Sequence, residues 1–207
     1  RATTAFNTAV NAAKAQQNIV IKKESEARLA CTVSEIAVPN EDVDAVLDKF
    51  EFLNTETFTV SGGTTADGKT ANDLIRPFGK DAELPVNGIL NAATITDTED
   101  GGKKIVLTFY KETAVLDPNG MTFPEKQSEY IDPLNLLTEE NKDRRLVSSA
   151  DLEYASTKIY ATIGADGKLL KMDVVAPVEA SAKVVVKYLY VNTRFEAVLR
   201  DRYVFTY

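Results

Sequence analysis

One eight-residue stretch, residues 63–70, has the residue types of a phosphate-binding loop. Its letters, GTTADGKT, fit the pattern G-x-x-x-x-G-K-[ST]. In such a loop the glycines let backbone N–H groups surround phosphate oxygens, the lysine neutralises them and the hydroxyl binds magnesium. The pattern therefore raises a first enzymatic hypothesis, a P-loop-type nucleotide-binding enzyme. Its phosphate contacts would come from Gly63, Gly68, Lys69 and Thr70.

The residues around this stretch favour a polar turn instead. A phosphate loop must join a buried parallel strand to the start of a helix. The preceding segment alternates Phe58 and Val60 with threonine, which is typical of a half-exposed antiparallel strand. Asp67 would place a carboxylate among N–H groups meant for anions, and Pro77 would end the following helix early. We therefore interpret residues 63–70 as an exposed bend that holds no phosphate.

Carboxylates raise a second enzymatic hypothesis, a glycan hydrolase that uses a pair of them. No spacing marks any pair, and an acidic surface explains these residues as well. The candidates are Glu112, Glu125, Glu129 and Asp132. The segment 97–102, DTEDGG, offers oxygen ligands for calcium but lacks the closing glutamate of a 12-residue calcium loop. We predict a hairpin turn there.

The composition excludes several kinds of chemistry. The chain has no histidine, and its one cysteine, Cys31, can build neither a zinc site nor an internal disulfide. The net charge of −7 opposes general binding to nucleic acid. No apolar run is long enough to span a membrane. We expect no cofactor, no metal and no membrane span, and we expect Cys31 to be a small buried hydrophobic residue.

Two early segments have the hydrophobic spacing of helices. In residues 3–17 and 41–52, apolar side chains recur three and four positions apart, and Asn40 is a suitable cap for the second helix. Later segments alternate apolar and polar residues and are joined by short turns at Gly101 and Gly167, so we expect antiparallel strands. Two alternating faces are expected near the end: Lys183, Val185, Lys187 and Leu189, and Val184, Val186, Tyr188 and Tyr190.

These patterns predict an α+β fold in which a mainly antiparallel, twisted sheet packs on one face against one or two helices. We expect a single domain over residues 1–207, with two lobes split near 114–133 as the alternative. Residues 131–146 have room for a short helix, and the polar segment 117–133 is interpreted as a long surface loop. Four tyrosines are expected in the core or at the sheet edge, with a ligand groove as the alternative: Tyr188, Tyr190, Tyr203 and Tyr207.

One hairpin sequence resembles a known class of proteins. The segment IYATIGADGKLLKMDV, residues 159–174, is similar to hairpins of exported Gram-positive surface proteins and lipoproteins of unassigned function. A helix followed by long antiparallel strands also resembles the lipoprotein-carrier architecture, in which a curved sheet cradles helices and sometimes a lipid. The resemblance has no signature residues, so it implies a fold class and a compartment but no site. Residues 64–91 depart from it, because they do not read as sheet.

We therefore expect a non-catalytic, exported binding or interaction module of a bacterial cell surface. The use of a single cysteine is compatible with export, and Arg1 in place of methionine fits the removal of a leader or tag. The expected location is secreted or cell-surface. No catalytic, cofactor-binding or metal-binding residue is assigned, and the ligand or partner protein is not specified. The P-loop-type enzyme and the glycan hydrolase remain the alternatives.

Overall fold

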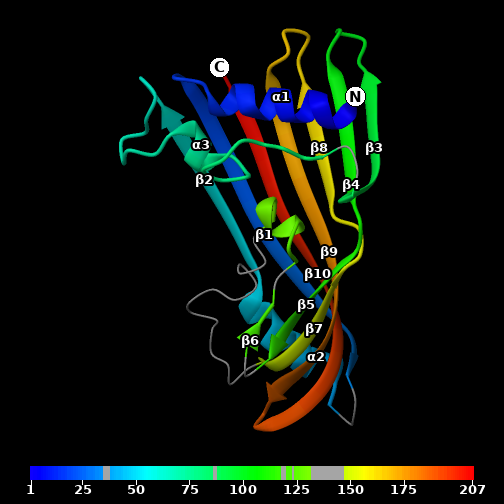
Figure 1. The fold of residues 1–207 in the computed structure, drawn as a ribbon. Coiled ribbons are helices and arrows are strands. Elements are labelled where there is room, and N and C mark those ends of the chain that lie inside the picture. The colour runs from blue at the N-terminus through cyan, green and yellow to red at the C-terminus, as the bar shows by residue number, and fades with distance from the viewer. Residues whose placement is uncertain (35–37, 86–87, 118–119, 123, 132–146) are drawn as a thin grey trace.

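The fold is known from a computed structural model, drawn in Figure 1. It describes residues 1–34, 38–85, 88–117, 120–122, 124–131 and 147–207. Helices and strands follow the chain in the order α1, β1, α2, η1, β2, α3, β3, β4, β5, β6, η2, β7, β8, β9 and β10, where η marks a 3-10 turn. Of the residues expected to hold a short helix, 132–146 lie outside the described part.

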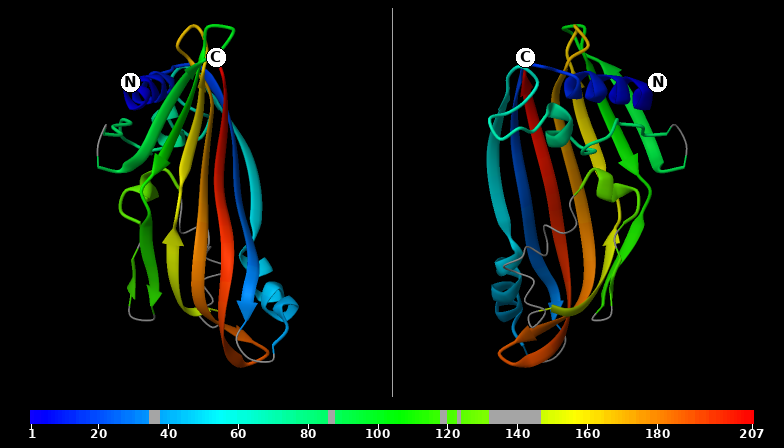
Figure 2. Two further views of the ribbon diagram at one scale, coloured as in Figure 1. Left: turned by 90° about the vertical axis from the view of Figure 1, so that its right-hand side faces the viewer. Right: turned by 60° about the vertical axis from the view of Figure 1, so that its left-hand side comes forward.

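The strands form one twisted, open sheet in which every described pairing is antiparallel, so the predicted mainly antiparallel sheet is confirmed (Figures 1 and 2). The main order of neighbours is β2-β1-β10-β9-β7-β5-β6. The strand bounds are β1 Ile19–Ser34, β2 Phe52–Val60, β3 Leu90–Asp97, β4 Lys103–Phe109, β5 Glu112–Asp117, β6 Gly120–Met121, β7 Val147–Tyr154, β8 Lys158–Ile163, β9 Leu169–Val186 and β10 Leu189–Thr206.

The sheet divides along β9. On one side β9 pairs with β10 along nearly its whole length and without a register shift. On its other side the upper half of β9 pairs with β8, and β4 and β3 continue from there, whereas its lower half pairs with β7, followed by β5 and β6. The sheet therefore has an upper and a lower wing that share β9, β10 and β1.

Gln127 holds the break between the two wings. Its side chain is fully buried, and its amide donates a hydrogen bond to the carbonyl of Tyr110, which separates β4 from β5 (2.8 Å). Its amide oxygen accepts from the hydroxyl of Thr157, which separates β7 from β8. Figure 1 shows the chain bending between β4 and β5 and between β7 and β8. Buried polar groups at interrupted strands need such partners, so Gln127 stabilises the bend.

The two predicted helices lie where the hydrophobic spacing places them, but Asn40 is the first residue of the second helix and not its cap, which is Pro39. α1 spans Ala2–Lys14, and its Phe6 and Val10 are fully buried. It crosses the upper end of the sheet (Figure 1). α2 spans Asn40–Leu47 and continues into η1, with acidic residues in its first turn that suit the positive end of the helix dipole. The other helical elements are η1 Asp48–Phe50, α3 Ala71–Leu74 and η2 Gln127–Glu129.

The α2 region also protects the part of β1 that pairs with β10 on one side but has no strand neighbour on the side of β2. β2 stops pairing with β1 at Ala27. Beyond that point the backbone N–H groups of Leu29 and Cys31 donate to the carboxylates of Glu51 and Asp44, both at 2.7 Å. An exposed strand edge otherwise presents unpaired backbone groups, so these carboxylates take the place of a neighbouring strand.

The predicted alternation through residues 183–190 is wrong at its centre. Lys187 and Tyr188 form the turn between β9 and β10, with φ angles of 48° and 70°. These left-handed values suit the two central residues of a tight hairpin turn, where asparagine and glycine are the usual choices. Because neither residue is a usual turn former, the sequence reads as continuous strand. Lys187 and Leu189 therefore do not continue the face of Lys183 and Val185.

Candidate binding hollow on the sheet

Residues 63–70 form a polar turn that stabilises itself. The N–H of Thr65 donates to the carbonyl of Lys69 at 2.8 Å, and the Lys69 ammonium lies 3.1 Å from the Asp67 carboxylate. The hydroxyl of Thr65 donates to Asp67 and lowers the pKa of that carboxyl. The preceding β2 is an antiparallel edge strand and the following α3 has four residues. A phosphate loop requires a parallel strand and a longer helix, so the local frame does not fit one.

The carboxylates considered for glycan hydrolysis have structural contacts. Glu112 accepts the backbone N–H groups of Lys126 and Gln127 at 3.2 and 3.0 Å, which caps η2. Glu129 pairs with Lys80 at 2.5 Å, and Glu125 is exposed. Asp132 lies outside the described residues. None of these contacts places two of the carboxylates across a cleft.

The segment 97–102 is the predicted hairpin turn between β3 and β4. Asp97 pairs with Lys103 at 2.7 Å, and Asp100 accepts from the Thr98 hydroxyl and the Gly102 N–H. These contacts lower the pKa of both carboxyls. Across the part of the chain that the structure describes, no group of three or more histidine, cysteine or acidic residues is arranged to hold a metal ion. No described helix has the length and apolar content of a membrane span.

The four tyrosines do not gather into one groove. Tyr203 is fully buried, and Tyr207, at the same end of β10, donates from its hydroxyl to the carbonyl of Leu169 at 3.0 Å. Burial raises the pKa of Tyr207 to about 12. Tyr188 and Tyr190 lie at the opposite end, beside the β9–β10 turn, and are exposed. The expected core position is found for Tyr203. Cys31, expected to be buried, is only half buried, and its sulfur lies 3.3 Å from the Thr193 hydroxyl.

A buried ionic cluster stabilises the upper wing on the side of α1. Asp201 and Arg76 are each 5% exposed, and the Arg76 Nε donates to Asp201 Oδ2 at 2.9 Å. The other carboxylate oxygen accepts the Ser25 hydroxyl at 2.5 Å. Arg76 also donates to the carbonyl of Ile131 and lies over the ring of Phe78. The cluster pairs its buried charges internally, as burial requires.

Side chains of α1 form hydrogen bonds with the backbone of the extended segment after Arg76, as a neighbouring strand would. Asn7 exchanges two hydrogen bonds with the backbone of Leu84, and Asn11 does the same with Ala82. The length of helix between Asn7 and Asn11 is close to the length of extended chain between Ala82 and Leu84, so both pairs of hydrogen bonds can form. Lys14 donates to the carbonyls of Pro77 and Lys80, and burial lowers the pKa of its amine to about 8.

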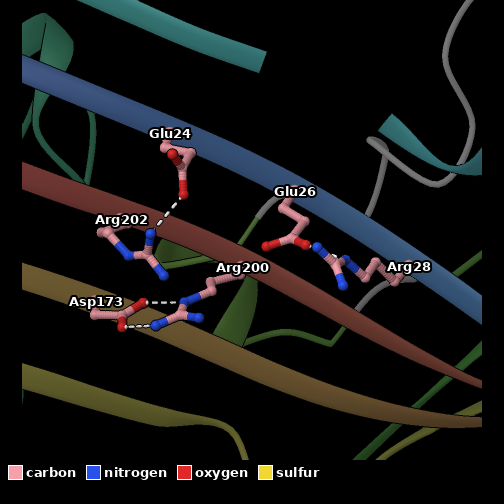
Figure 3. A network of polar contacts seen from close by, with 6 residues as sticks. All are labelled: Glu24, Glu26, Arg28, Asp173, Arg200 and Arg202. Atoms are coloured by element: carbon pink, nitrogen blue, oxygen red, sulfur yellow. Dashed lines mark hydrogen bonds and ion pairs between the residues drawn. The ribbon is translucent and has the colours of Figure 1, made fainter. Parts of the chain in front are cut away.

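The opposite face of the sheet, called the outer face below, carries paired charges in its upper part. Residues directly opposite on neighbouring strands share a face, and Glu24, Arg202 and Asp173 form such a row across β1, β10 and β9. Arg202 donates to Glu24 at 2.6 Å (Figure 3). Arg200, in the next row, donates two hydrogen bonds to Asp173, and these bonds raise the pKa of Arg200. Nearby, Arg28 forms an ion pair with Glu26.

Further down, the outer face is hollowed. Two adjoining depressions of about 620 and 530 Å³ share Val115, Asp151, Ser181 and Arg194 as lining residues, so we treat them as one hollow. It crosses β5, β7, β9, β10 and the end of β1, below the break held by Gln127. Its polar lining is Thr32, Thr113, Ser149, Asp151, Glu153, Glu179, Ser181, Lys183, Asn192, Thr193, Arg194 and Glu196.

The charges in the hollow are arranged differently from those above it. Glu153, Glu179 and Glu196 lie directly opposite one another on β7, β9 and β10, and we call them the carboxylate row. Lys111 pairs with Glu153 at 2.6 Å. In the described part of the chain, no ion pair involves Glu179, Glu196 or Asp151, nor the side chains of Lys183 and Arg194. Among the described residues, the hollow therefore presents charges of both signs that have no ion-pair partner.

Comparison with known proteins adds no family to this description. No protein family model, no curated protein sequence and no solved structure matches the chain. A function therefore has to be inferred from the geometry and charges given above.

Sequence reasoning missed the hollow and the carboxylate row. The row joins strands that are distant in the chain, so no local motif contains it. One signal was present: Glu179 and Glu196 are equally far from the Lys187-Tyr188 turn, so they must face each other once that turn is recognised. The unusual residues of the turn concealed this pairing.

Proposed function

We propose that the protein is a non-catalytic, exported binding or interaction module of a bacterial cell surface, and that the hollow is its binding site. The observation that carries this proposal is a set of charges of both signs, in a concave part of the sheet, that have no ion-pair partner among the described residues. Charged groups in a partly enclosed site are stabilised by a partner that supplies the opposite charge. Binding sites are generally concave, with a few converging polar groups.

We infer that the hollow is accessible to a ligand because both helices lie on the other face of the sheet. The even-numbered side chains of β9 are buried from Met172 to Val186, and the register with β10 does not shift. α1 contacts β9 at its upper end and α2 contacts it at its lower end. We infer that both helices lie against this buried side, so the odd-numbered side chains that line the hollow remain open to a ligand.

The lining defines the class of ligand. Arg194 and Lys183 provide donors for carboxylate or phosphate groups, whereas Glu179 and Glu196 suit ammonium groups. Ser181 lies among them and can exchange hydrogen bonds with hydroxyl and amide groups. An amphoteric polar polymer or an extended protein segment combines all of these groups. Export is supported by the use of a single cysteine and by the resemblance of residues 159–174 to exported surface proteins.

The test is titration of the ¹⁵N-labelled protein with soluble cell-wall glycopeptides, which carry ammonium, carboxylate and hydroxyl groups. We expect saturable amide shifts confined to residues of β7, β9 and β10 that line the hollow. Arg194→Glu should abolish them, whereas Lys22→Glu, an exposed cation higher on the same face, should not. Shifts that lie outside the hollow, or no saturable shift at millimolar probe, would contradict the proposal.

A further inference from the structure

The edge strands β2, β3 and β6 of the described sheet are protected to different extents. Natural sheets limit pairing with other chains by short edge strands, bulges, proline or charged residues, especially lysine. β6 is two residues long, and β3 has a register shift after Leu90 and ends in the ion-paired Asp97. β2 is nine residues long, pairs with β1 without a shift, and contains neither lysine nor proline. β2 is therefore the least protected edge.

β2 lies at the margin of the sheet in all views (Figures 1 and 2). Five consecutive residues, 53–57, are exposed, including Leu53 at 64%. Among the described strands only β1 pairs with β2. Its second row of backbone donors and acceptors therefore has no strand partner within the described chain.

The sequence of β2 is close to symmetric about Thr55. Residues 52–58 read FLNTETF, with phenylalanine at both ends and a polar residue on each side of the centre. Two copies running antiparallel and centred on Thr55 would place Phe52 opposite Phe58 and Asn54 opposite Glu56. Aromatic pairs and amide–carboxylate pairs are favourable at directly opposite positions. Each pair would occur twice, as a two-fold interface requires.

We propose that β2 pairs with β2 of a second copy of this chain, antiparallel and in the register centred on Thr55. Phe52 and Phe58 are half-buried and already pack against the core, so their pairing across the seam continues the core from one copy into the other. Asn54 donates its amide hydrogens to Glu56 of the second copy. A strand of an unrelated protein would meet the same backbone groups but would need the same complementary spacing by chance.

The first test uses engineered cysteines in a Cys31→Ser background. In the proposed register the two copies of residue 55 face each other at a Cα distance of about 4.5–5.5 Å, which suits a disulfide. Residue 57 faces residue 53, so two copies of residue 57 lie about 13 Å apart and cannot be bridged. On mild oxidation we expect Thr55→Cys to form a covalent dimer, and Thr57→Cys to remain monomeric under denaturing conditions.

The second test measures the dimer dissociation constant by sedimentation equilibrium at low salt. Asn54→Glu places glutamates opposite each other twice and should weaken the dimer about tenfold or more, whereas Asn54→Lys should strengthen it severalfold. Both substitutions are at an exposed position, and residue 54 faces Ser25 within the monomer. A wild-type protein that stays monomeric at millimolar concentration would overturn the proposal. So would cross-linking at residue 57 but not 55, or the same direction of change for both charges.

Discussion

Two rows of residues on the outer face of the same sheet use charge in opposite ways. In the upper row Glu24, Arg202 and Asp173 alternate in sign across three strands. In the lower row Glu153, Glu179 and Glu196 have the same sign across three strands. Like charges directly opposite each other on a sheet destabilise it, and opposite charges stabilise it. The upper row thus contributes to the fold, whereas the carboxylate row acts against it.

The difference extends beyond these two rows. In the upper wing, two buried polar sites are satisfied by the chain itself: the carboxylate of Asp201 by Arg76 and Ser25, and the backbone of Ala82 by Asn11. In the hollow, Glu179 and Arg194 have no ion-pair partner among the described residues. A region that gives up stability in this way is typical of binding sites. This contrast is what the proposed function explains, and three predictions test it.

The largest effect is expected for Arg76→Met in the upper wing. It removes the guanidinium that pairs with the buried Asp201 and leaves the carboxylate with Ser25 and with Lys23 at 3.9 Å. Loss of one partner of a buried pair costs about 3–5 kcal/mol of unfolding free energy. Urea denaturation measures it. Lys103→Met, which breaks the exposed pair with Asp97, is the control and should cost less than about 1 kcal/mol. Equal losses for the two variants would mean that the upper wing does not depend on its internal pairing.

A smaller loss of unfolding free energy is expected for Asn11→Ala. The backbone N–H and carbonyl of Ala82, a residue only 1% exposed, lose their side-chain partner. Leaving such groups unsatisfied costs about 1–3 kcal/mol, which the better helix propensity of alanine offsets by a few tenths. Gln16→Ala is the control, because the amide of Gln16 bonds only its own exposed helix end. A loss for Asn11→Ala no larger than that of the control would show that α1 does not clamp the extended segment.

The elements that the sequence predicted are those with local signals. Phe6 and Val10 lie at helix spacing, and Gly101 and Gly167 adopt the left-handed φ angles that their turns require. Residues 65–70 likewise form a turn through local hydrogen bonds, between Thr65 and Lys69 and between Gly68 and Thr65, although Gly63 donates to the distant carbonyl of Gln17. In each case the physical cause lies within a few residues of the element, so a pattern in the chain can reveal it.

The hollow has no local cause. Its residues come from five strands, and their register depends on the turn at Lys187-Tyr188 and on the break bridged by Gln127. The turn lacks the usual turn residues, and the break depends on hydrogen bonds to Tyr110 and Thr157 that join three separate segments. Sequence alternation shows which side chains share a face of one strand, but not which side chains of other strands lie opposite.

The smallest effect tests the comparison most directly, through the unfolding free energies of Glu179→Gln and Glu24→Gln at low salt. Both substitutions remove one carboxylate from the outer face and keep its size. Glu24→Gln removes the partner of Arg202, whereas Glu179→Gln removes the central member of the carboxylate row. We predict that the first destabilises the protein and the second stabilises it, each by about 0.2–1 kcal/mol. If Glu179→Gln is as destabilising as Glu24→Gln, the Glu179 carboxylate has a stabilising partner within the chain, and the claim that the hollow holds unpaired charges is wrong.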